Sequence, residues 1–535
     1  MRIFTFDTTL RDGTQGEAVA FSVEDKLIIA QKLDELGIDY IEGGWPGSNP
    51  RDKEFFARAR ELKLKHAKLT AFGSTRFARN RVDQDPNVRQ LLEAGTPVVS
   101  IFGKSWDLHT QRALGITEDE NLALIGETVG HIKDHGKEVV YDAEHFFDGF
   151  CGNPDFALRT LEAAQKAGAS VLCLCDTNGG MMPSRLVEIV AEVRKRFDGI
   201  IGIHCHNDSD VAVANTLAAV EAGVTHVQGC FNGYGERCGN ANMCSILANL
   251  ELKFGHTTIG PDKLAQLTSV ARFIAELANL SVRNDQPYVG RSAFAHKGGV
   301  HVSAVLKDSA TYEHVKPDTV GNRQRVLLSD LSGRSNILYK LKQHGLMDRL
   351  DDAAHRELLE RIKHMEFMGY ELEAAEGTFE LLVREALHPG TNLFDVVNYE
   401  VTTKGGAKDS QTVATVTLKA QDGIHSATAN GHGPVNALDL CLRQCLSQLY
   451  PAIKEVHLMD YKVRVIDSKK GTAAKVRVLI EWSDHKRSWA TVGVSDNVIT
   501  ASWHALVDAI KLELMRLMEK DDTLEKAVED YCWGV

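Results

Sequence analysis

The amino-acid sequence predicts an α/β protein in three parts: a (β/α)8 TIM barrel, helical linker subdomains, and a C-terminal α+β domain with two β-hairpin–helix repeats. Two observations lead to this prediction. Short apolar, β-rich runs alternate with helix-length amphipathic stretches over about the first 240 residues. A strand–turn–strand–helix pattern then occurs twice near the other end. We expect domain boundaries at 1–270, 271–395 and 396–535.

The barrel prediction rests on eight apolar runs, each followed by room for one helix. Eight strand-and-helix units in succession are typical of a TIM barrel. The expected strands are Ile3–Phe6, Tyr40–Trp45, Leu69–Phe72, Val98–Phe102, Val139–Ala143, Val171–Cys175, Ile200–His206 and Val227–Phe231.

The helix after the first strand has clear signals at both ends. Ser22 and Asp25 have the spacing of a capping box, and Gly37 is the expected stop. Between them, an apolar face runs through Ile29, Leu33 and Leu36. The barrel prediction therefore has local support.

Two histidines on the seventh expected strand can share one metal ion. Residues two apart on a strand point to the same face, so His204 and His206 lie together while Cys205 points the other way. Asp12 follows the first strand and offers a hard oxygen ligand, with Arg11 beside it. The alternatives are a packed histidine pair in a polar core and a turn with a surface ion pair.

Active sites of TIM barrels lie at the carboxyl ends of the strands. Two imidazoles, one carboxylate and open positions suit a divalent ion that polarises a carbonyl group, and Mn, Zn, Co or Mg are all compatible with these ligands. Seven polar residues fall at or just past the ends of the expected strands: Asp12, Glu42, Glu144, Thr177, His204, His206 and Asn240.

Three segments in this order carry a family resemblance: Asp7-Thr-Thr-Leu-Arg-Asp-Gly13, His204-Cys-His-Asn-Asp208 and Gly233-Tyr-Gly-Glu-Arg-Cys-Gly-Asn240. They resemble the motifs of the DRE-TIM metallolyases, in the branch of isopropylmalate, homocitrate and citramalate synthases. The resemblance continues through Phe294-Ala-His-Lys-Gly-Gly-Val-His301 and Tyr312 to a C-terminal regulatory module, and so covers essentially the whole chain. It implies an acyltransferase that condenses acetyl-CoA with a 2-oxo acid and hydrolyses the resulting thioester.

The resemblance also implies a role for the residues of the first motifs. Asp12, His204 and His206 would ligate the divalent metal, and Asn240 would lie in or near the coordination shell. Arg11 would bind substrate and stabilise the enolate or the alkoxide oxygen that forms on attack.

Four further matches concern the substrates. Glu144 and Thr177 match positions that orient the substrate and help in proton transfer. His301 and Tyr312 match a pair that acts on acetyl-CoA and in thioester hydrolysis. Thr177 could instead be an ordinary strand-end hydroxyl and Tyr312 could be merely packed, while His296 is expected to be structural.

Trp45-Pro46 indicates the acceptor. The segment around it resembles the corresponding segment of the longer citramalate synthases, whereas isopropylmalate synthases usually carry Phe-Pro at this position. This favours pyruvate, on the pyruvate route to isoleucine. Phe72, Phe102 and Asp142 are candidates to line the methyl end of the acceptor, because they lie near strand ends. A carboxylate at position 142 departs from the apolar side chain expected beside a methyl group.

Three other functions stay open at this point. The first is 2-isopropylmalate synthase, which uses 2-oxoisovalerate in leucine synthesis. The second is a metal-dependent aldolase or lyase on the same barrel, which His301, Tyr312 and the repeat module disfavour. The third is a non-catalytic ligand sensor built on the repeats, which the metal constellation disfavours.

The region from about Pro261 to Leu393 has a helical pattern with little strand signal. The expected helices are Leu264–Leu280, Asn336–His344 and Ala353–Met368. Such a segment is usually a connector. The resemblance implies that it covers the active site of a neighbouring chain, and therefore that the enzyme is a homodimer.

The C-terminal repeat is visible without any family. The first copy has strands at Ala414–Ala420 and His425–Ala429, then a helix at Val435–Leu449. The second has strands at Val476–Trp482 and Ser488–Val492, then a helix at Ser502–Leu514. Small molecules can bind between two such halves. The resemblance implies feedback inhibition by isoleucine, or by leucine in an isopropylmalate synthase; the alternative is a dimerisation module without a ligand.

Composition favours a cytoplasmic enzyme. The chain has 535 residues, 43% of them hydrophobic, and a net charge of −12, with no basic stripe for nucleic acid and no apolar run of membrane-spanning length. Arg11 lies so near Met1 that no cleavable signal is expected before it, and the ten cysteines are expected to be reduced. The glycines of Gly233–Asn240 lack dinucleotide-binding spacing, which disfavours a nicotinamide-dependent dehydrogenase.

Overall fold

The computed structural model of the chain describes residues 1–297, 299–305, 307–326, 351–372, 374–391, 393–405, 410–420, 423–466, 468–484 and 488–532. The chain divides into two compact units, each of which is described by itself. The first comprises Met1–Ala295 and Glu313–Arg325, and the second comprises His296–Tyr312 and Val326–Val535.

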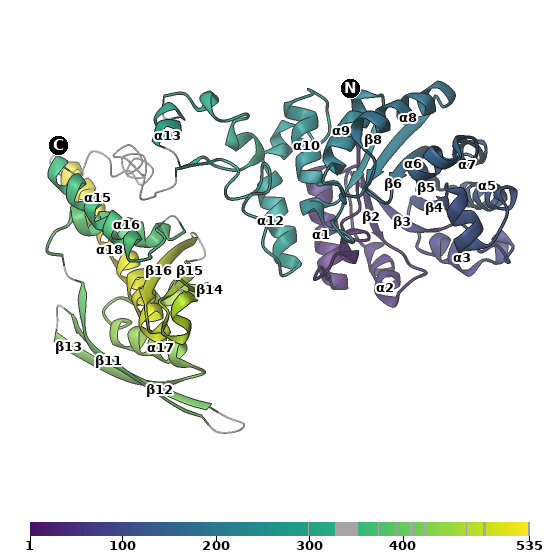
Figure 1. Ribbon diagram of the computed structural model, residues 1–535. Coiled ribbons are helices and arrows are strands. Elements are labelled where there is room, and N and C mark those ends of the chain that lie inside the picture. The colour runs from purple at the N-terminus through teal and green to yellow at the C-terminus, as the bar shows by residue number, and fades with distance from the viewer. Residues whose placement is uncertain are drawn as a thin grey trace. The chain divides into compact units, whose positions relative to one another are not determined.

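Eight parallel strands close into a barrel in the first unit, and each strand pairs with its neighbours in sequence, β1 with β8 included (Figure 1). No end of a predicted strand differs from the observed end by more than two residues, so the predicted barrel is confirmed. The strands are β1 (Phe4–Asp7), β2 (Tyr40–Gly44), β3 (Lys68–Ser74), β4 (Val98–Lys104), β5 (Glu138–Glu144), β6 (Val171–Asp176), β7 (Ile200–Cys205) and β8 (His226–Gly229).

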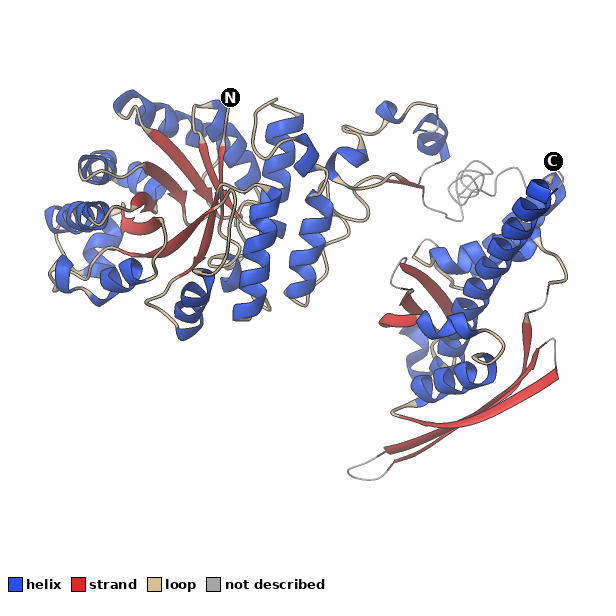
Figure 2. Cartoon of the chain, turned by 180° about the vertical axis from the view of Figure 1, so that it is seen from behind, coloured by secondary structure: helices blue, strands red, loops and turns tan. Residues whose placement is uncertain are grey.

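Helices surround the ring of strands (Figure 2). Their apolar faces pack on the outward side chains of the strands and form the main core of this unit. The larger helices are α1 (Val23–Leu36), α2 (Pro50–Ala59), α3 (Pro86–Glu93), α5 (Glu118–Asp134), α7 (Pro154–Lys166), α8 (Pro183–Arg196), α9 (Ala212–Glu221), α10 (Met243–Leu252) and α12 (Leu267–Leu277), and the short ones are α4 (Asp107–His109), α6 (Phe146–Gly152) and α11 (Pro261–Leu264).

Two helix predictions can be compared directly with the structure. The capping box of Ser22 and Asp25 and the left-handed Gly37 bound α1 as expected. The single helix expected at Leu264–Leu280 is wrong, because α11 ends at Leu264 and α12 begins at Leu267. The apolar spacing continues across this turn, since Leu264, Leu267 and Val270 are all buried, and the sequence pattern therefore did not show the break.

Before its sheets, the part of the second unit that the structure describes is mainly helical. Outside the C-terminal repeats, its described helices include α13 (Gly299–Val305), α15 (Asp352–Phe367) and α16 (Glu376–Leu387). Helix α15 confirms the prediction at Ala353–Met368. The two-residue strands β9 (Ala295–His296) and β10 (Arg325–Val326) were not expected, and the helix predicted at Asn336–His344 lies outside the described residues.

The C-terminal repeat is present, but each copy has three strands instead of a hairpin. The first copy is β11 (Phe394–Gly405), β12 (Ser410–Ala420), β13 (Gly423–Gly431) and α17 (Pro434–Leu446). The second is β14 (His457–Val465), β15 (Val476–Ser483), β16 (Ser488–Ser495) and α18 (Val498–Cys532). Both sheets are antiparallel, in chain order. Strands β11 and β14 are mostly exposed edge strands, so they lack the alternation of buried apolar residues that reveals a strand.

The two repeats share one apolar core. Trp482 of β15, Leu442 of α17 and Ile510 of α18 are fully buried in it. A separate small cluster joins α15 and α16 through residues such as Leu358 and Phe379. Within the part of the chain that the structure describes, no helix is both long and apolar enough to cross a membrane.

Candidate metal centre at the barrel mouth

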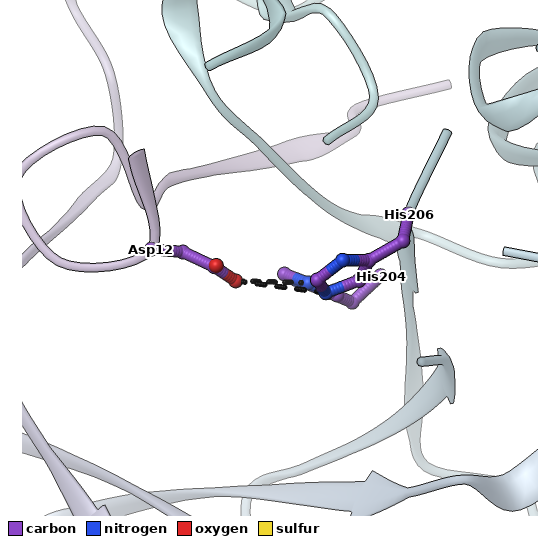
Figure 3. A group of neighbouring side chains, drawn as sticks. All are labelled: Asp12, His204 and His206. Carbon is purple, nitrogen blue, oxygen red and sulfur yellow. Dashed lines mark ion pairs between the residues drawn. The ribbon is translucent and has the colours of Figure 1, made fainter. Parts of the chain in front are cut away.

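Asp12, His204 and His206 meet at the carboxyl ends of the barrel strands (Figure 3). Asp12 follows β1, His204 lies on β7 and His206 comes directly after β7. Oδ2 of Asp12 is 3.3 Å from Nε2 of His204 and 3.8 Å from Nε2 of His206. All three residues are buried. The structure therefore brings together the three residues that the sequence pattern singled out.

Two buried oxygen atoms at this place have no hydrogen-bond partner among the described residues. They are Oδ1 of Asp12 and Oδ1 of Asn240. Asn240 forms a β-bridge with His206, so the backbones of these two residues are paired. Buried polar atoms without a donor are rare and costly, and a cation would satisfy both oxygens. Two nitrogen and two oxygen donors suit Zn, Mn, Co or Mg, so the residues present fit a divalent ion.

The titration of these groups suits a cation. Burial alone would raise the pKa of Asp12, but Arg11, His204 and His206 hold that pKa well below its usual range. Burial alone would lower the pKa of His204, but the Asp12 carboxylate raises it above its usual value. Burial, together with His204, lowers the pKa of His206 to about 4. At neutral pH, Asp12 and His206 are thus already in the forms that bind metal.

Arg11 is held rigidly next to Asp12. Its Nε donates to Oε2 of Glu42 at 2.6 Å, and its Nη1 lies 3.2 Å from Oδ2 of Asp12. The guanidinium lies over the ring of Phe72, 3.8 Å from the centroid. Burial raises the pKa of Glu42 to about 7, and Arg11 limits this rise. Arg11 is thus a cation of fixed orientation at the edge of the candidate metal centre.

An aromatic cluster adjoins Arg11. The rings of Phe72 and Phe102 stack at 5.4 Å, and both make edge contacts with Trp45 at 5.9 and 5.6 Å. The indole Nε1 of Trp45 donates to Oδ1 of Asn87 at 2.8 Å. Phe72 and Phe102, which were expected to line the pocket, therefore lie together with Trp45, the residue that indicated the acceptor. Their contact with an acceptor stays a prediction.

Glu144 and Thr177 both have partners within the protein. Glu144 forms a salt bridge with Lys104 of β4. Oγ1 of Thr177 accepts a hydrogen bond from the backbone N–H of His145 at 2.9 Å. His145 has a φ of 57°, so Thr177 supports a strained turn directly after β5. The roles predicted for Glu144 and Thr177 in substrate orientation stay predictions.

His301 and Tyr312 belong to the second unit. Their rings stack with centroids 4.2 Å apart, so the structure pairs the two residues as the resemblance implied. Both side chains are exposed, Tyr312 by 45%. The prediction that they act on acetyl-CoA is untested.

Sequence reasoning gave no role to Arg237, which organises the glycine-rich loop. Arg237 donates to both oxygens of Asp208, at 2.7 and 2.9 Å, and to the carbonyl of Thr177 at 2.8 Å, and its Nη2 lies 3.2 Å from Nδ1 of His206. The backbone of this loop is packed so tightly that a Cβ atom on Gly239 would lie 2.0 Å from the carbonyl oxygen of Gly233, and a glycine is therefore needed there. Arg237 lies inside the recognised segment Gly233–Asn240, but its partners are distant in the sequence, so its contacts could not be predicted.

A second set of polar residues lies behind His204, and of its members only Asp142 was singled out from the sequence, for a different role. Nδ1 of His204 lies 3.0 Å from Oε1 of Gln228, and Nε2 of Gln228 donates to Oδ1 of Asp142 at 2.9 Å. The hydroxyl of Ser100 donates to Oδ2 of Asp142 at 2.5 Å. Gln228 and Ser100 are polar residues within otherwise apolar strands, a signal that could have been followed. Both oxygens of Asp142 are occupied within the protein, and its predicted place in the acceptor pocket is untested.

Comparison with known families divides the chain into three matched regions. Residues 2–274 match the HMGL-like family, residues 288–369 match the homocitrate synthase post-HMGL domain-like family, and residues 373–514 match the LeuA allosteric (dimerisation) domain. The first match coincides with the barrel, and the third covers both C-terminal repeats up to α18.

Several curated relatives match over nearly their full length. The (R)-citramalate synthase of Aquifex aeolicus is 52% identical over 518 residues, covering 96% of this chain and 98% of the relative. That of Geobacter sulfurreducens is 52% identical over 516 residues, with 96% and 98% covered. A 2-isopropylmalate synthase of Methanocaldococcus jannaschii is 30% identical over 516 residues, with 95% and 94% covered. The chain belongs to the HMGL-like family of barrel enzymes, in the branch that contains the (R)-citramalate synthases.

Proposed function

We propose that this chain is an acyltransferase that condenses acetyl-CoA with pyruvate and hydrolyses the thioester, giving (R)-citramalate and CoA. The observation that carries the proposal is the joint presence of a full-length match to (R)-citramalate synthases and a converged Asp12, His204 and His206 centre beside Arg11. This reaction is the first step of the pyruvate route to isoleucine.

The metal centre would activate the acceptor. Asp12, His204, His206 and Asn240 would hold the divalent ion, which polarises the carbonyl group of the 2-oxo acid. Arg11 lies next to this centre in a fixed orientation and can donate hydrogen bonds to the oxygen at which negative charge develops. Its contacts with Glu42 and Phe72 keep the guanidinium in place before substrate binds.

The condensation needs a base on the acetyl-CoA side. The acetyl methyl group loses a proton, its carbon forms a bond with C2 of pyruvate, and the oxygen on C2 takes up a proton. Water then cleaves the thioester, which releases CoA as the thiol. We assign proton transfer near the acceptor to Glu144, with Thr177 as its orienting neighbour, and the acetyl-CoA side to His301 and Tyr312.

Acceptor choice would depend on the aromatic cluster. Phe72 and Phe102 stack on each other, and both contact Trp45. Pyruvate presents a methyl group there and 2-oxoisovalerate an isopropyl group. Two extra methyl groups change binding by only about 1 to 3 kcal/mol, so rejection of the larger acid requires a filled pocket.

Release of the CoA thiol tests the proposal. The apo protein is loaded with Mn²⁺, Zn²⁺, Co²⁺ or Mg²⁺ in turn, and pyruvate, 2-oxoisovalerate and 2-oxoglutarate are compared as acceptors at equal concentration. Pyruvate is expected to give the highest kcat/KM, and a chelator is expected to abolish thiol release. A preference for 2-oxoisovalerate would make the chain a 2-isopropylmalate synthase, and the absence of release with every acid would contradict condensation.

The second unit would regulate the enzyme. The region matched to the LeuA allosteric (dimerisation) domain supports a homodimer under allosteric control, and we propose isoleucine as its feedback inhibitor. Sedimentation of the full chain tests the dimer, and inhibition of thiol release by isoleucine but not by leucine tests the effector. We further propose a cytoplasmic location, because nine of the ten cysteines are free thiols in the structure. We keep 1–270, 271–395 and 396–535 as the proposed domains.

A further inference from the structure

His204 is backed by a line of hydrogen bonds that crosses the interior of the barrel. The line runs from His204 on β7 to Gln228 on β8, then to Asp142 on β5 and Ser100 on β4. All four residues are at least 95% buried. Because the neighbours of each group are protein atoms and not solvent, each hydrogen bond constrains the next one in the line.

The direction of this line follows from the chemistry of its members. An amide group has one accepting oxygen and one donating nitrogen. Oδ1 of Asp142 accepts, so the group of Gln228 that faces it is the Nε2 donor, at 2.9 Å. The oxygen Oε1 of Gln228 is then left for Nδ1 of His204, at 3.0 Å. Nδ1 must carry a proton to donate to it.

A neutral imidazole carries its proton on one nitrogen only. With that proton on Nδ1, the lone pair of His204 lies on Nε2. Nε2 is the atom that faces Oδ2 of Asp12, at 3.3 Å, where the metal ligands converge. The line therefore selects the tautomer in which His204 can ligate a metal ion.

We infer that Gln228 and Asp142 are positioning residues that set the tautomer and ring orientation of His204 for metal binding. The inference rests on the proposed role of His204 as a metal ligand, although it does not depend on which 2-oxo acid is the acceptor. It gives Asp142 a role behind the metal centre, where a carboxylate is needed because it can only accept.

The neighbouring thiols suggest another use of Asp142, which the contacts disfavour. The thiols of Cys173 and Cys175 lie within 4.8 Å of its carboxylate, as a second metal site would require. However, both carboxylate oxygens already accept hydrogen bonds. Burial also keeps the pKa of the Cys173 thiol well above its usual value, so this thiol stays protonated.

Metal affinity without substrate tests the inference. Titration calorimetry with Zn²⁺ or Co²⁺ on the full-length apo protein compares the wild type with Q228M, which keeps the length of the side chain and removes the acceptor. Partners of metal-binding histidines typically contribute about 10- to 100-fold in metal affinity, so Q228M is expected to weaken binding by this factor. The ligand-field spectrum of bound Co²⁺ should change in the same variant.

A double variant separates positioning from packing. In D142N/Q228E, the amide introduced at position 142 can donate to the carboxylate introduced at position 228, which still accepts from His204, while Ser100 donates to the amide oxygen. The hydrogen bond between positions 142 and 228 is reversed, but shape, net charge and the acceptor that faces His204 are preserved, and affinity is expected to return to within about threefold of wild type. T128V serves as a folding control, because it removes a buried hydrogen bond to the carbonyl of Leu124 and has no link to His204.

The inference would be overturned if Q228M bound metal as tightly as wild type, or if D142N/Q228E bound it as weakly as Q228M. Failure of the wild type to bind any divalent ion would overturn it as well. If the three proteins show the expected metal affinities but the wild type releases no CoA thiol, the proposed condensation is contradicted and the positioning role still stands.

Discussion

Protons compete with the metal ion at His204 and hardly at all at His206. Burial lowers the pKa of His206 to about 4, whereas Asp12 outweighs the effect of burial at His204 and raises its pKa. Between about pH 6 and pH 8, only His204 of this pair must lose a proton to bind metal. We therefore expect metal affinity to rise with pH in this range, by at most about tenfold per pH unit while His204 is protonated.

Calorimetry in two buffers with different ionisation enthalpies measures this effect. The number of protons released on binding should fall towards zero as the pH passes the pKa of free His204. The H206Q variant is expected to bind more weakly and to keep the same slope. A constant affinity across this pH range would contradict the assignment of the raised pKa to His204.

Arg11 acts through the direction of its guanidinium and not only through its charge. In R11K, the ammonium group keeps the charge next to Asp12 but loses the planar contact with Phe72 and the fixed Nε contact with Glu42. We expect kcat/KM for pyruvate to fall by about 10²- to 10³-fold, as for the loss of one preorganised donor.

Metal affinity of R11K should change little, because the positive charge remains. Steady-state kinetics and calorimetry on the same preparation check both parts. Loss of metal binding in step with activity would mean that Arg11 supports the metal centre and not the transition state.

The residues of the site differ in how far sequence could predict them. His204 and His206 follow from the period of a strand, and Asp12 from its position after the first strand. The hydrogen bonds of Gln228 and Asp142 could not be predicted this way, because Gln228 lies 24 residues from His204 and 86 residues from Asp142. Which side chains meet across the barrel depends on strand stagger, which periodicity does not give.

At the level of elements, a buried ion pair joins α1, α2 and the end of β2. Lys26 of α1 pairs with Asp52 of α2 and donates to the carbonyl of Gly43 at 3.1 Å. Asp52 also accepts from the backbone N–H of Trp45 at 2.8 Å. Gly44 is required here, since a Cβ atom on it would lie 2.4 Å from Cγ of Asp52. The pair thus fixes the backbone from which Trp45 enters the aromatic cluster.

Removal of one partner should be costly. K26M leaves the Asp52 carboxylate buried without its cation, and we expect the free energy of unfolding of the barrel to fall by about 3 to 5 kcal/mol. Urea unfolding of the full chain measures this. The control is K32M on the same helix, whose pair with Glu35 lies at the surface and should contribute less than about 1 kcal/mol. Equal effects of the two variants would contradict the element-level role of Lys26.

Elements were predictable from sequence where burial imposed a period. The barrel strands, α1 and α15 each bury a defined face. Strands β11 and β14 expose most of their side chains, and the break between α11 and α12 interrupts the backbone without interrupting the apolar spacing. Exposed edge strands and breaks of this kind depend on tertiary contacts of the backbone, which the local amino-acid composition does not reveal.

At the level of the molecule, the two units have separate hydrophobic cores. The barrel core extends from Ile3 to Val320, and the repeat core from Leu381 to Met515. The sequence predicted a barrel and a separate duplicated module, because the period of the apolar residues changes between them, whereas the three domain boundaries stay predictions. Separate cores can unfold separately, and ligands that bind one of them stabilise that one.

We expect scanning calorimetry of the full chain to resolve two unfolding transitions. Co²⁺ should raise only the midpoint of the barrel, because its ligands Asp12, His204 and His206 all lie in the first unit. Isoleucine should raise only the midpoint of the repeats if the proposed effector role holds. At about 100 times Kd, each ligand adds about 2.7 kcal/mol to the unit that binds it. The H204A/H206A variant should lose the response to Co²⁺ and keep the response to isoleucine. A single transition that both ligands raise together would show that the units unfold as one, and energetic coupling between metal centre and effector would then follow directly from the shared transition.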